Sequence, residues 1–242
     1  QLLSEIESRL PKDLSSYDTY IEPFIGGGAV LFHLLATHKF ERIIAFDINP
    51  ELILCYQTIQ SDLEKVISAL QKLENAYPEF QNFEERKDFY YSVRTSWNTI
   101  PKNVFKMNKS DRIDRVAKTI FLNKTCFNGL FRVNSKGEFN VPMGSYVNPK
   151  IADRSNLINV SNAIQNVQFV HCDYTTIESY IGEKTFVYLD PPYRPLTNSS
   201  SFTAYSKSGF NDDDQRELAL LCEKLNQENV SFILSNSDPK NT

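Results

Sequence analysis

The sequence predicts an α/β protein built on a doubly wound, mostly parallel sheet. Short apolar runs of strand length alternate along the chain with longer segments of helical periodicity, a pattern typical of parallel strands joined by helices. A glycine-rich turn joins the first predicted strand to a helix, and acidic residues end or follow later strands. Because ligands of open α/β sheets bind at the carboxyl ends of the strands, these residues also predict where the site lies.

Length and composition limit the class of protein. The chain has 242 residues, enough for one sizeable α/β core with a smaller insertion, and its 41% hydrophobic and 23% charged residues are ordinary for a globular protein. It contains no apolar run of membrane-spanning length, and residues 1–20 carry no signal-peptide pattern. Its four cysteines and three histidines are scattered, so we expect a reduced, intracellular protein without a disulfide framework, a zinc site or a membrane partner.

Charge is distributed unevenly along the chain. Residues 101–154 contain eleven Lys or Arg and four Asp or Glu, although the whole chain has a net charge of −4. A basic segment in an otherwise acidic protein is typical of a module that binds phosphates, as in nucleic acids. The alternative is a solvated helix face with surplus lysines.

The glycine-rich turn occupies residues 22–28, between a predicted strand over 17–25 and a predicted helix over 29–36. Glycines let the backbone approach a ligand closely, and the start of a helix offers free N–H groups. No Gly-Lys-Ser/Thr sequence follows, so the turn is not a P-loop. Glu22 disfavours a pyrophosphate and suits a ligand with a sulfonium and an ammonium group.

An acidic residue ends the second predicted strand, which spans 42–47. Asp47 lies about 20 residues after the glycine turn, the spacing at which a carboxylate holds ribose hydroxyls in nucleotide sites. The alternative is that Asp47 caps a helix. Asn49 and Pro50 predict the start of the next helix, with Asn49 as its cap and Pro50 in its first turn.

The middle of the chain predicts helices and one hairpin. Residues 51–77 and 82–97 have helical periodicity broken near Pro78, and residues 111–126 predict a helix whose polar side carries Arg112, Arg115 and Lys118. Apolar pairs flank the turn 134–137, which predicts a β-hairpin in which Gly137 supplies a positive φ. Asn and Arg side chains just before this turn can pair with base edges, and nearby aromatic residues can stack on bases. The alternative is an ordinary surface hairpin.

The last third predicts the remaining strands, over 167–170, 186–189 and 230–234, and helices over 155–165 and from Asn211, whose first turn holds three aspartates that favour the helix dipole. Asp173 follows the first of these strands, where it could bind an adenine amino group or cap the next turn. Residues 197–210, rich in Ser, Thr and aromatics, predict a mobile loop over the site.

The tetrad Asp190-Pro191-Pro192-Tyr193 follows the strand predicted over 186–189. Its prolines end the strand and fix the backbone. Asp190 and the Pro191 carbonyl could accept hydrogen bonds from the amino group of a planar ring, and Tyr193 could stack on the ring. The alternative is a strand end followed by a proline turn.

These motifs, in this order, resemble those of the Dam-like DNA adenine methyltransferases: Glu-Pro-Phe-Ile-Gly-Gly-Gly, Asp47, Phe-Asn-Gly-Leu-Phe-Arg-Val-Asn with Glu-Phe-Asn-Val-Pro, and Asp-Pro-Pro-Tyr. The chain is most similar to the members that recognise GATC, including the DpnII-type modification enzymes. The resemblance implies a Rossmann-like methyltransferase fold with an inserted, mainly helical target-recognition domain that carries the β-hairpin. We expect a catalytic domain over 1–60 and 155–242, the insert over 61–154, and both chain ends cut from a longer protein.

The resemblance also implies the chemistry: a methyl group moves from S-adenosylmethionine, which leaves as S-adenosylhomocysteine, to N6 of an adenine flipped out of double-stranded DNA, without a metal. The implied catalytic residues are Asp190, Pro191, Pro192 and Tyr193. The implied cofactor residues are Glu22, Pro23, Phe24, Gly26, Gly27, Gly28, Asp47, Ile48, Asp173, Tyr174 and Asp190. The implied DNA-binding residues are Lys124, Phe127, Asn128, Leu130, Arg132, Asn140, Pro142 and Tyr146.

The resemblance places the protein in the cytoplasm of a bacterial cell or of a phage-infected one, at the nucleoid, and it is compatible with a restriction endonuclease of the same system without a physical complex. Two departures from the family are visible. The chain starts just past the usual Lys-Trp-x-Gly-Gly-Lys segment, and it has Ser145 and Val147 where relatives often carry Arg and Lys. The alternatives are methylation of cytosine N4 or of RNA, and a non-catalytic DNA-binding relative.

Overall fold

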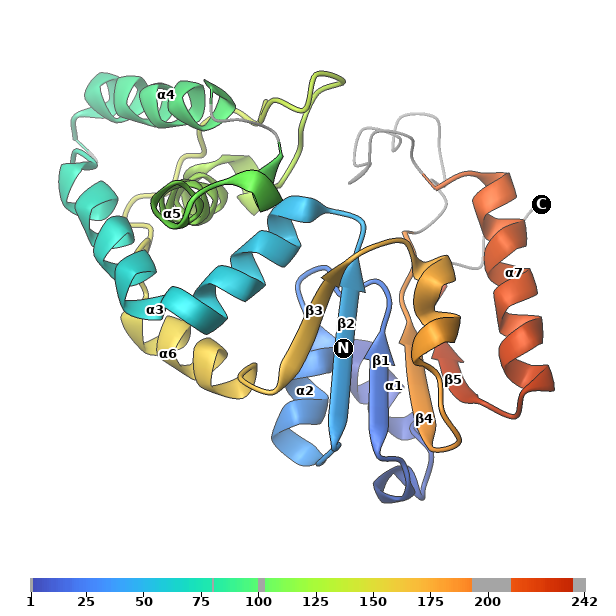
Figure 1. Ribbon diagram of the computed structural model, residues 1–242. Coiled ribbons are helices and arrows are strands. Elements are labelled where there is room, and N and C mark those ends of the chain that lie inside the picture. Colours follow the sequence, from blue (N-terminus) through green and yellow to red (C-terminus); the bar gives the residue numbers. More distant parts are fainter. Residues whose placement is uncertain (1, 80, 100–102, 193–209, 237–242) are drawn as a thin grey trace. The chain divides into compact units, whose positions relative to one another are not determined.

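The computed structural model describes residues 2–79, 81–99, 103–192 and 210–236. The chain divides into two compact units, which Figure 1 shows together: unit 1 contains residues 1–53 and 165–242, and unit 2 contains residues 54–164. The predicted target-recognition insert, residues 61–154, falls within unit 2. Its role in DNA recognition stays a prediction.

Unit 1 contains a parallel sheet, so the predicted α/β class is confirmed. Over the described ranges, its five strands lie in the order β3-β2-β1-β4-β5. The strands are β1 (Thr19–Glu22), β2 (Arg42–Asp47), β3 (Val167–His171), β4 (Thr185–Leu189) and β5 (Ser231–Leu234). The chain runs from β1 through β2 to β3 and then returns to β4 on the other side of β1. Because this reversal is a topological switch point, a ligand is expected at the carboxyl ends of β1 and β4.

The two strands at the switch point are the best buried. Every residue of β1 and β4 is buried, as expected for central parallel strands covered on both faces. Their register pairs Ile21 of β1 with Val187 of β4, and Ile21 also pairs with Ile44 of β2. The residues that follow Ile21 and Val187 therefore emerge side by side at the carboxyl edge.

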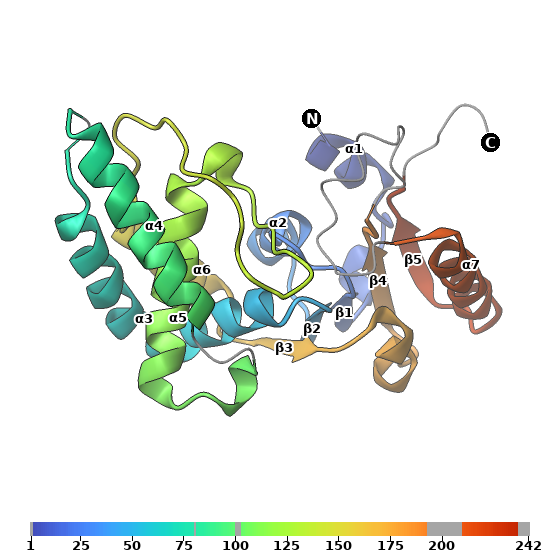
Figure 2. The ribbon, with the colours of Figure 1, turned by 90° about the horizontal axis from the view of Figure 1, so that it is seen from above.

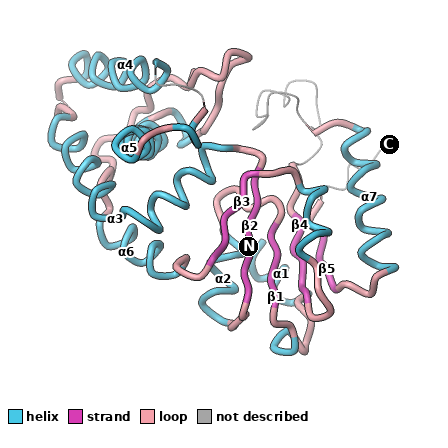
Figure 3. Tube along the Cα trace, viewed as in Figure 1, coloured by secondary structure: helices cyan, strands magenta, loops and turns pink. Residues whose placement is uncertain are grey.

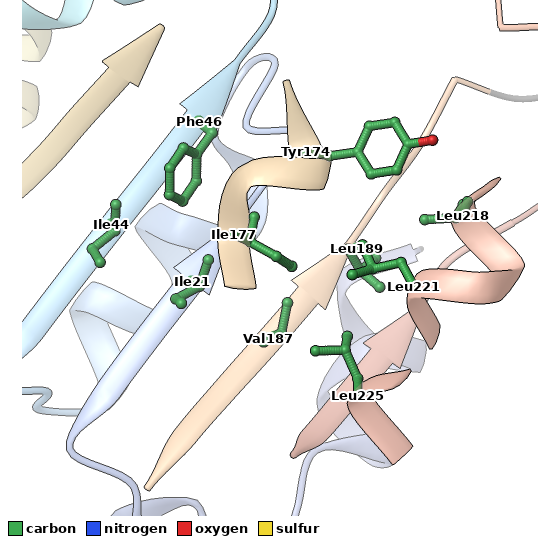
Figure 4. Close-up of a cluster of buried hydrophobic side chains, with 10 residues drawn as sticks. All are labelled: Ile21, Ile44, Phe46, Tyr174, Ile177, Val187, Leu189, Leu218, Leu221 and Leu225. Atoms are coloured by element: carbon green, nitrogen blue, oxygen red, sulfur yellow. The ribbon is translucent and has the colours of Figure 1, made fainter. Parts of the chain in front are cut away.

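Helices cover both faces of the sheet. Helices α1 (Leu2–Arg9) and α2 (Ala29–Thr37) lie on one side, and the short helix η4 (Tyr174–Tyr180) lies on the other (Figure 2). On the face of η4, aliphatic side chains of the sheet pack with η4 and with α7 (Asp212–Gln227) in one core cluster (Figure 4). Helix α7 begins as predicted, because Asn211 and Asp214 form a reciprocal capping box.

Unit 2 is mainly helical. Its helices are α3 (Pro50–Ala76, which starts at the end of unit 1), α4 (Phe83–Thr99), η2 (Val104–Lys106), α5 (Lys109–Thr125), η3 (Phe127–Gly129) and α6 (Arg154–Ala163). The helices predicted on either side of Pro78 are confirmed. Helix α3 is kinked at Asp62, where φ is −138°, and the Asp62 carboxylate lies 2.6 Å from the Lys109 ammonium.

The prediction that Arg115 lies on the polar side of its helix was wrong. Arg115 is 2% exposed. Its guanidinium lies 3.4 Å from the centroid of the Trp97 ring and donates a hydrogen bond to the Trp97 carbonyl. Trp97 in turn donates from Nε1 to Thr119 Oγ1 over 2.9 Å. The arginine is buried because its charge stacks on an indole and its donors find a carbonyl.

The predicted hairpin is present without regular strands. The turn is confirmed: Gly137 has φ 74°, and the Asn134 N–H donates to the Glu138 carbonyl over 2.9 Å. Beyond the turn, the antiparallel pairing consists of two isolated bridges, Val133 with Phe139 and Cys126 with Met143, so Figure 3 draws these residues as loop. On its other edge, the backbone of Phe139 bonds to the Asn98 side chain of helix α4, as described below.

Candidate active site

Four acidic residues gather at the carboxyl edge of the sheet in unit 1. Glu22 ends β1, Asp47 ends β2, Asp173 follows β3 and Asp190 follows β4. Burial is the main cause of a raised pKa of Glu22, and the charge of Asp190 raises it further, so the two carboxyl groups at the switch point interact. The parallel strands therefore bring together residues that are far apart in the sequence.

The glycine turn leaves open space over its backbone. Gly26 and Gly28 have φ angles of 46° and 70°, which favour glycine. Gly27 does not lie in the left-handed region, and a Cβ added there would meet no other atom of the described residues within 4 Å. Neither its backbone conformation nor its packing against the described residues explains this glycine. Close approach of a ligand to the backbone does explain it.

Asp47 ties the glycine turn to the second strand. Its carboxylate accepts hydrogen bonds from the Gly26 N–H over 3.0 Å and from the Asn49 N–H over 2.8 Å. Burial raises the pKa of Asp47, and these N–H groups oppose that effect. Each oxygen keeps lone-pair capacity for a further donor such as a hydroxyl. The predicted cap is confirmed, since Asn49 Oδ1 accepts from the Glu51 N–H over 3.0 Å.

Glu22 is a buried acid that accepts hydrogen bonds from two neutral groups, the Tyr20 hydroxyl and the backbone N–H of Leu31. It is 2% exposed, and Tyr20 donates its hydroxyl proton to Oε2 over 2.7 Å. Burial raises the pKa of Glu22 to about 8, and the Tyr20 hydrogen bond partly offsets this. The carboxyl group is therefore protonated at neutral pH until a cation approaches it.

Replacing Glu22 by Gln should remove a pH dependence of stability. Between the unfolded pKa, about 4.3, and the folded pKa of about 8, only the folded state keeps the proton. The unfolding free energy of the wild type should therefore fall as pH rises through this window and level off above it. Urea unfolding across the window checks this, with the exposed Glu41→Gln as control. Identical pH profiles for wild type and Glu22→Gln would contradict it.

Asp173 is a helix cap in this structure. Its Oδ1 accepts from the Thr175 N–H and hydroxyl, both over 2.9 Å, so the capping alternative is confirmed, and binding of an adenine ring stays a prediction. Tyr174 lies in the core cluster, 6% exposed, with its ring 5.0 Å from that of Phe24 and its hydroxyl donating to the Asp214 carbonyl. Its predicted contact with cofactor stays a prediction too.

The tetrad follows β4 as predicted. Pro191 is buried and Pro192 is exposed. Tyr193 lies outside the described residues, as do residues 197–209 of the loop predicted over 197–210. On the neighbouring strand end, Ile48 is 55% exposed, and its carbonyl lies 3.0 Å from His171 Nε2. An exposed apolar side chain beside Asp47 fits a flat ligand ring.

The predicted DNA-binding residues lie on one segment of unit 2. Phe127 and Tyr146 are 51% and 40% exposed, which is unusual for large aromatic side chains. The exposed polar, basic and proline members are Lys124, Asn128, Asn140 and Pro142, and the half-buried members are Leu130 and Arg132. Sequence reasoning missed that Asn128 has a positive φ of 54°, although the dipeptide Asn128-Gly129 is a signal for it.

Internal ion pairs account for part of the basic excess in residues 101–154. Besides the buried Arg115, the paired residues are Lys109 with Asp62, Lys118 with Asp114, Lys150 with Asp153 and Arg154 with Glu64. Of the lysines and arginines in these pairs, Lys109, Lys150 and Arg154 have exposed side chains, whereas that of Lys118 is only 15% exposed. The charge count alone could not show this pairing.

The sheet order, the glycine turn and the row of acids define a Rossmann-like methyltransferase fold. A family model described as D12 class N6 adenine-specific DNA methyltransferase matches residues 1–242, and the chain belongs to this family. It is therefore a DNA adenine-N6 methyltransferase, and the predicted class and activity are confirmed.

Relatives with known names agree with this assignment. The chain is 49% identical over 239 residues to the Type II methyltransferase M.MjaIII of Methanocaldococcus jannaschii, covering 98% of this chain and 80% of that protein. It is 34% identical to the Type II methyltransferase M1.LlaDCHI of Lactococcus lactis subsp. cremoris, covering 98% and 77%. It is 31% identical to a DNA adenine methylase of Vibrio cholerae, covering 100% and 79%.

The described residues offer neither a metal cluster nor a membrane-spanning helix. No group of three or more His, Cys, Asp or Glu side chains in the described ranges is arranged to hold a metal ion. Within the same ranges, every helix is too short or too polar to cross a membrane.

Proposed function

We propose that the chain transfers the methyl group of S-adenosylmethionine to N6 of an adenine flipped out of double-stranded DNA, within the sequence GATC. The observation that carries the cofactor proposal is the open space over Gly27, at the switch point and beside Glu22, Asp47 and Asp190. A glycine that the fold itself does not require supports a ligand that lies against its backbone.

The chemistry of the surrounding residues fits this cofactor. The turn formed by Gly26, Gly27 and Gly28 at the start of α2 would take the amino-acid end, with Pro23 and Phe24 shaping the turn. Asp47 would bind the ribose hydroxyls, and Ile48, Asp173 and Tyr174 would surround the adenine ring. Glu22 would ionise next to the cationic groups of the ligand, because an opposite charge lowers the pKa of a buried acid. When bound, S-adenosylmethionine supplies an electrophilic methyl group on a sulfonium sulfur.

The tetrad would hold the target base. An adenine stacked in a duplex cannot reach the cofactor, so it must flip out at a cost of about a few kcal/mol. Asp190 and the Pro191 carbonyl would accept hydrogen bonds from its amino group, and Pro192 keeps the backbone rigid. Stacking on Tyr193 would stabilise the flipped base by roughly 1–3 kcal/mol.

Asp190 has a second task in this proposal. The adenine amine is a weak nucleophile because its lone pair is delocalised into the ring. Hydrogen bonds to Asp190 and the Pro191 carbonyl would orient the amine and localise the lone pair, and positioning of this kind supplies much of an enzyme's acceleration. The Asp190 carboxylate would also stabilise the positive charge that develops on the nitrogen.

Unit 2 would choose the site. Arg132 can pair with a guanine edge and Asn128 with an adenine edge, while aromatic side chains at Phe127 and Tyr146, with Leu130, wedge or stack against bases. Lys124, Asn140 and Pro142 would contact the DNA near them. The Type II names of two relatives support a modification role beside a restriction endonuclease, acting on DNA inside the cell.

Plasmid digestion tests the proposed sequence. Plasmid DNA is incubated with full-length protein and S-adenosylmethionine, and is then cut with enzymes specific for methylated or for unmethylated GATC. We expect protection from the second kind and cutting by the first. N6-methyladenine formed only at other sequences would contradict GATC while leaving the methyl transfer in place. Undetectable cofactor binding by full-length protein would favour the non-catalytic alternative.

A substitution at Asn128 can test base recognition without disturbing the backbone, because its positive φ of 54° is also adopted by glycine. Asn128→Gly keeps the positive φ without strain and removes the amide, so stability should change by no more than about 0.5 kcal/mol. Discrimination at one base pair should fall by roughly 1–3 kcal/mol. Methylation rates on duplexes that differ at single positions measure this. If a fully folded Asn128→Gly protein discriminates between base pairs as well as the wild type does, Asn128 does not take part in base recognition.

A further inference from the structure

One face of helix α4 carries four polar side chains, spaced four residues apart, that bind the backbone after the hairpin turn. They are Arg86, Tyr90, Arg94 and Asn98. Side chains four residues apart on a helix stand one above another. Their partners lie along residues 139–147, which we name the return segment. Sequence reasoning did not find this set.

The first two residues of the row, Arg86 and Tyr90, are buried donors. Arg86, 4% exposed, donates from Nη2 to the Tyr146 carbonyl over 3.0 Å and from Nη1 to the Val147 carbonyl over 3.4 Å. Tyr90, which is fully buried, donates its hydroxyl to the Val141 carbonyl over 2.9 Å. Buried donors of this kind are costly to leave unpaired, so these bonds hold the segment firmly.

The next two residues complete the row. Arg94 donates from Nη1 to the same Val141 carbonyl over 3.2 Å. Asn98 both donates from Nδ2 to the Phe139 carbonyl over 3.2 Å and accepts from the Phe139 N–H over 2.7 Å. The Asn98 amide thus takes the place of a neighbouring strand. These bonds lie on the edge of the return segment that faces away from the first half of the hairpin, toward which the Asn140 N–H donates to the Arg132 carbonyl over 3.1 Å.

Each arginine of the row is itself held in place. The Arg86 guanidinium lies 4.5 Å from the centroid of the Tyr77 ring, and the Arg94 guanidinium lies 4.4 Å from that of Tyr91. Helix α4 is locked to α5 by Trp97, through the contacts with Arg115 and Thr119 described above. The donors therefore have defined positions before they meet the return segment.

The opposite edge of the return segment forms backbone hydrogen bonds with Thr125 and Phe127, at the start of the predicted DNA-binding segment. The Gly144 N–H donates to the Thr125 carbonyl over 2.8 Å, and the Phe127 N–H donates to the Pro142 carbonyl over 2.9 Å. A Cβ on Gly144 would come within 2.8 Å of the Cys126 carbonyl oxygen, so the two backbones are in close contact. Backbone bonds on one side and α4 side chains on the other fix the register of the segment.

Register decides which side chains the return segment presents. Phe139 and Val141 are 2% and 1% exposed, whereas Asn140 and Pro142 between and after them are exposed. Asn140 also accepts from Arg132 Nε at its Oδ1 over 2.8 Å, so its position sets that of the guanidinium. A shift by one residue would exchange the buried and the exposed sets.

We propose that Arg86, Tyr90, Arg94 and Asn98 are positioning residues for target recognition. They hold the return segment in the register that presents Asn140 and Tyr146, and through Asn140 they orient Arg132. This inference rests on the proposed function in one respect, the assignment of DNA reading to these three residues. The four α4 side chains do not contact DNA in this proposal. They bind the protein backbone and affect base preference by positioning the residues that contact the bases.

The test measures base preference over all sequences, so it does not depend on GATC being the target. Full-length wild type, Asn98→Ala and Tyr90→Phe methylate a DNA library with adenine in every flanking context, and sequencing reads the methylated positions. The preference of the favoured site over sites changed at one base should fall at least about fivefold in Asn98→Ala, the low end of one base contact. Tyr90→Phe should lose less, because Arg94 still donates to Val141.

Controls separate positioning from general damage. Thr95→Ala, an exposed change on the same helix, should keep the wild-type preference, and cofactor affinity should stay within about twofold in all variants. A uniform loss of rate with an unchanged preference in Asn98→Ala would overturn the proposal, since that is what a merely structural role gives. If Asn98→Ala fails to fold, Tyr90→Phe with Arg94→Lys is read in the same way. If Arg132→Ala also leaves the preference unchanged, the assignment of DNA reading to the hairpin is what has failed.

Discussion

Replacing Asp190 by Ala is expected to lower methyl transfer by at least about 10²–10³-fold, the cost of removing one group that stabilises developing charge. Asp190 lies at the switch point, directly after β4, whose residues are all buried. Besides burial, the charge of Asp190 raises the pKa of Glu22 at the end of β1. Duplex DNA binding should stay within about twofold, because target reading is assigned to unit 2. Single-turnover methylation and a DNA-binding titration measure the two quantities separately.

The matched variants sharpen this result. Asp190→Asn keeps the shape and loses the charge, so it should also be strongly impaired. Glu183→Gln changes an exposed acid just before the amino end of the same strand and should have wild-type activity. Because the Asp190 charge raises the pKa of Glu22, either substitution of Asp190 should shift the Glu22 stability window to lower pH. Full activity of Asp190→Ala would remove the tetrad from the mechanism.

Replacing Arg115 by Ala is expected to destabilise the protein by about 3 kcal/mol or more, from the cavity left behind and the buried carbonyl left unpaired. The guanidinium is stacked on Trp97 and bonded to its carbonyl, and the side chain is 2% exposed. Arg115→Lys keeps the charge but loses the planar stacking and the fork of donors, so it should recover only part of the loss. Urea unfolding of the full chain measures the differences.

Arg112 provides the control for Arg115. It lies on the same helix and is exposed, so Arg112→Ala should change the unfolding free energy by no more than about 0.5 kcal/mol. Similar losses in Arg112→Ala and Arg115→Ala would show that the stacking on Trp97 contributes nothing particular. That result would also weaken the idea that α4 is locked to α5.

The sheet could be predicted from the sequence because its signals are local. The second strand was predicted over 42–47, and β2 spans Arg42–Asp47. Its ends could be predicted because charged residues bound the apolar run on both sides. The start of α7 was predicted for the same reason, as a cap and an acidic first turn are adjacent in the chain. Order along the chain then placed Glu22, Asp47, Asp173 and Asp190 at one edge.

What the sequence did not predict depends on distant partners. Arg115 belongs by type to a polar face, and its burial depends on partners such as Trp97, eighteen residues earlier in the chain. The return segment has the composition of a strand, and one edge of its backbone bonds to the side chains of Asn98 and Tyr90 on helix α4, distant in the sequence. At Asp47 and Asp173 the sequence left capping and ligand binding open. The structure confirms hydrogen bonds from backbone N–H groups at both, which leaves their ligand roles as proposals.

Transfer of isotope-labelled methyl from S-adenosylmethionine to duplex DNA by full-length protein, followed by nucleoside analysis, tests the central claim most directly. We expect the label in N6-methyladenine, a loss of at least about 10²-fold in Asp190→Ala, and an unchanged amount in Glu183→Gln. Label in cytosine, label only when RNA is supplied, or equal label with Asp190→Ala would contradict the account.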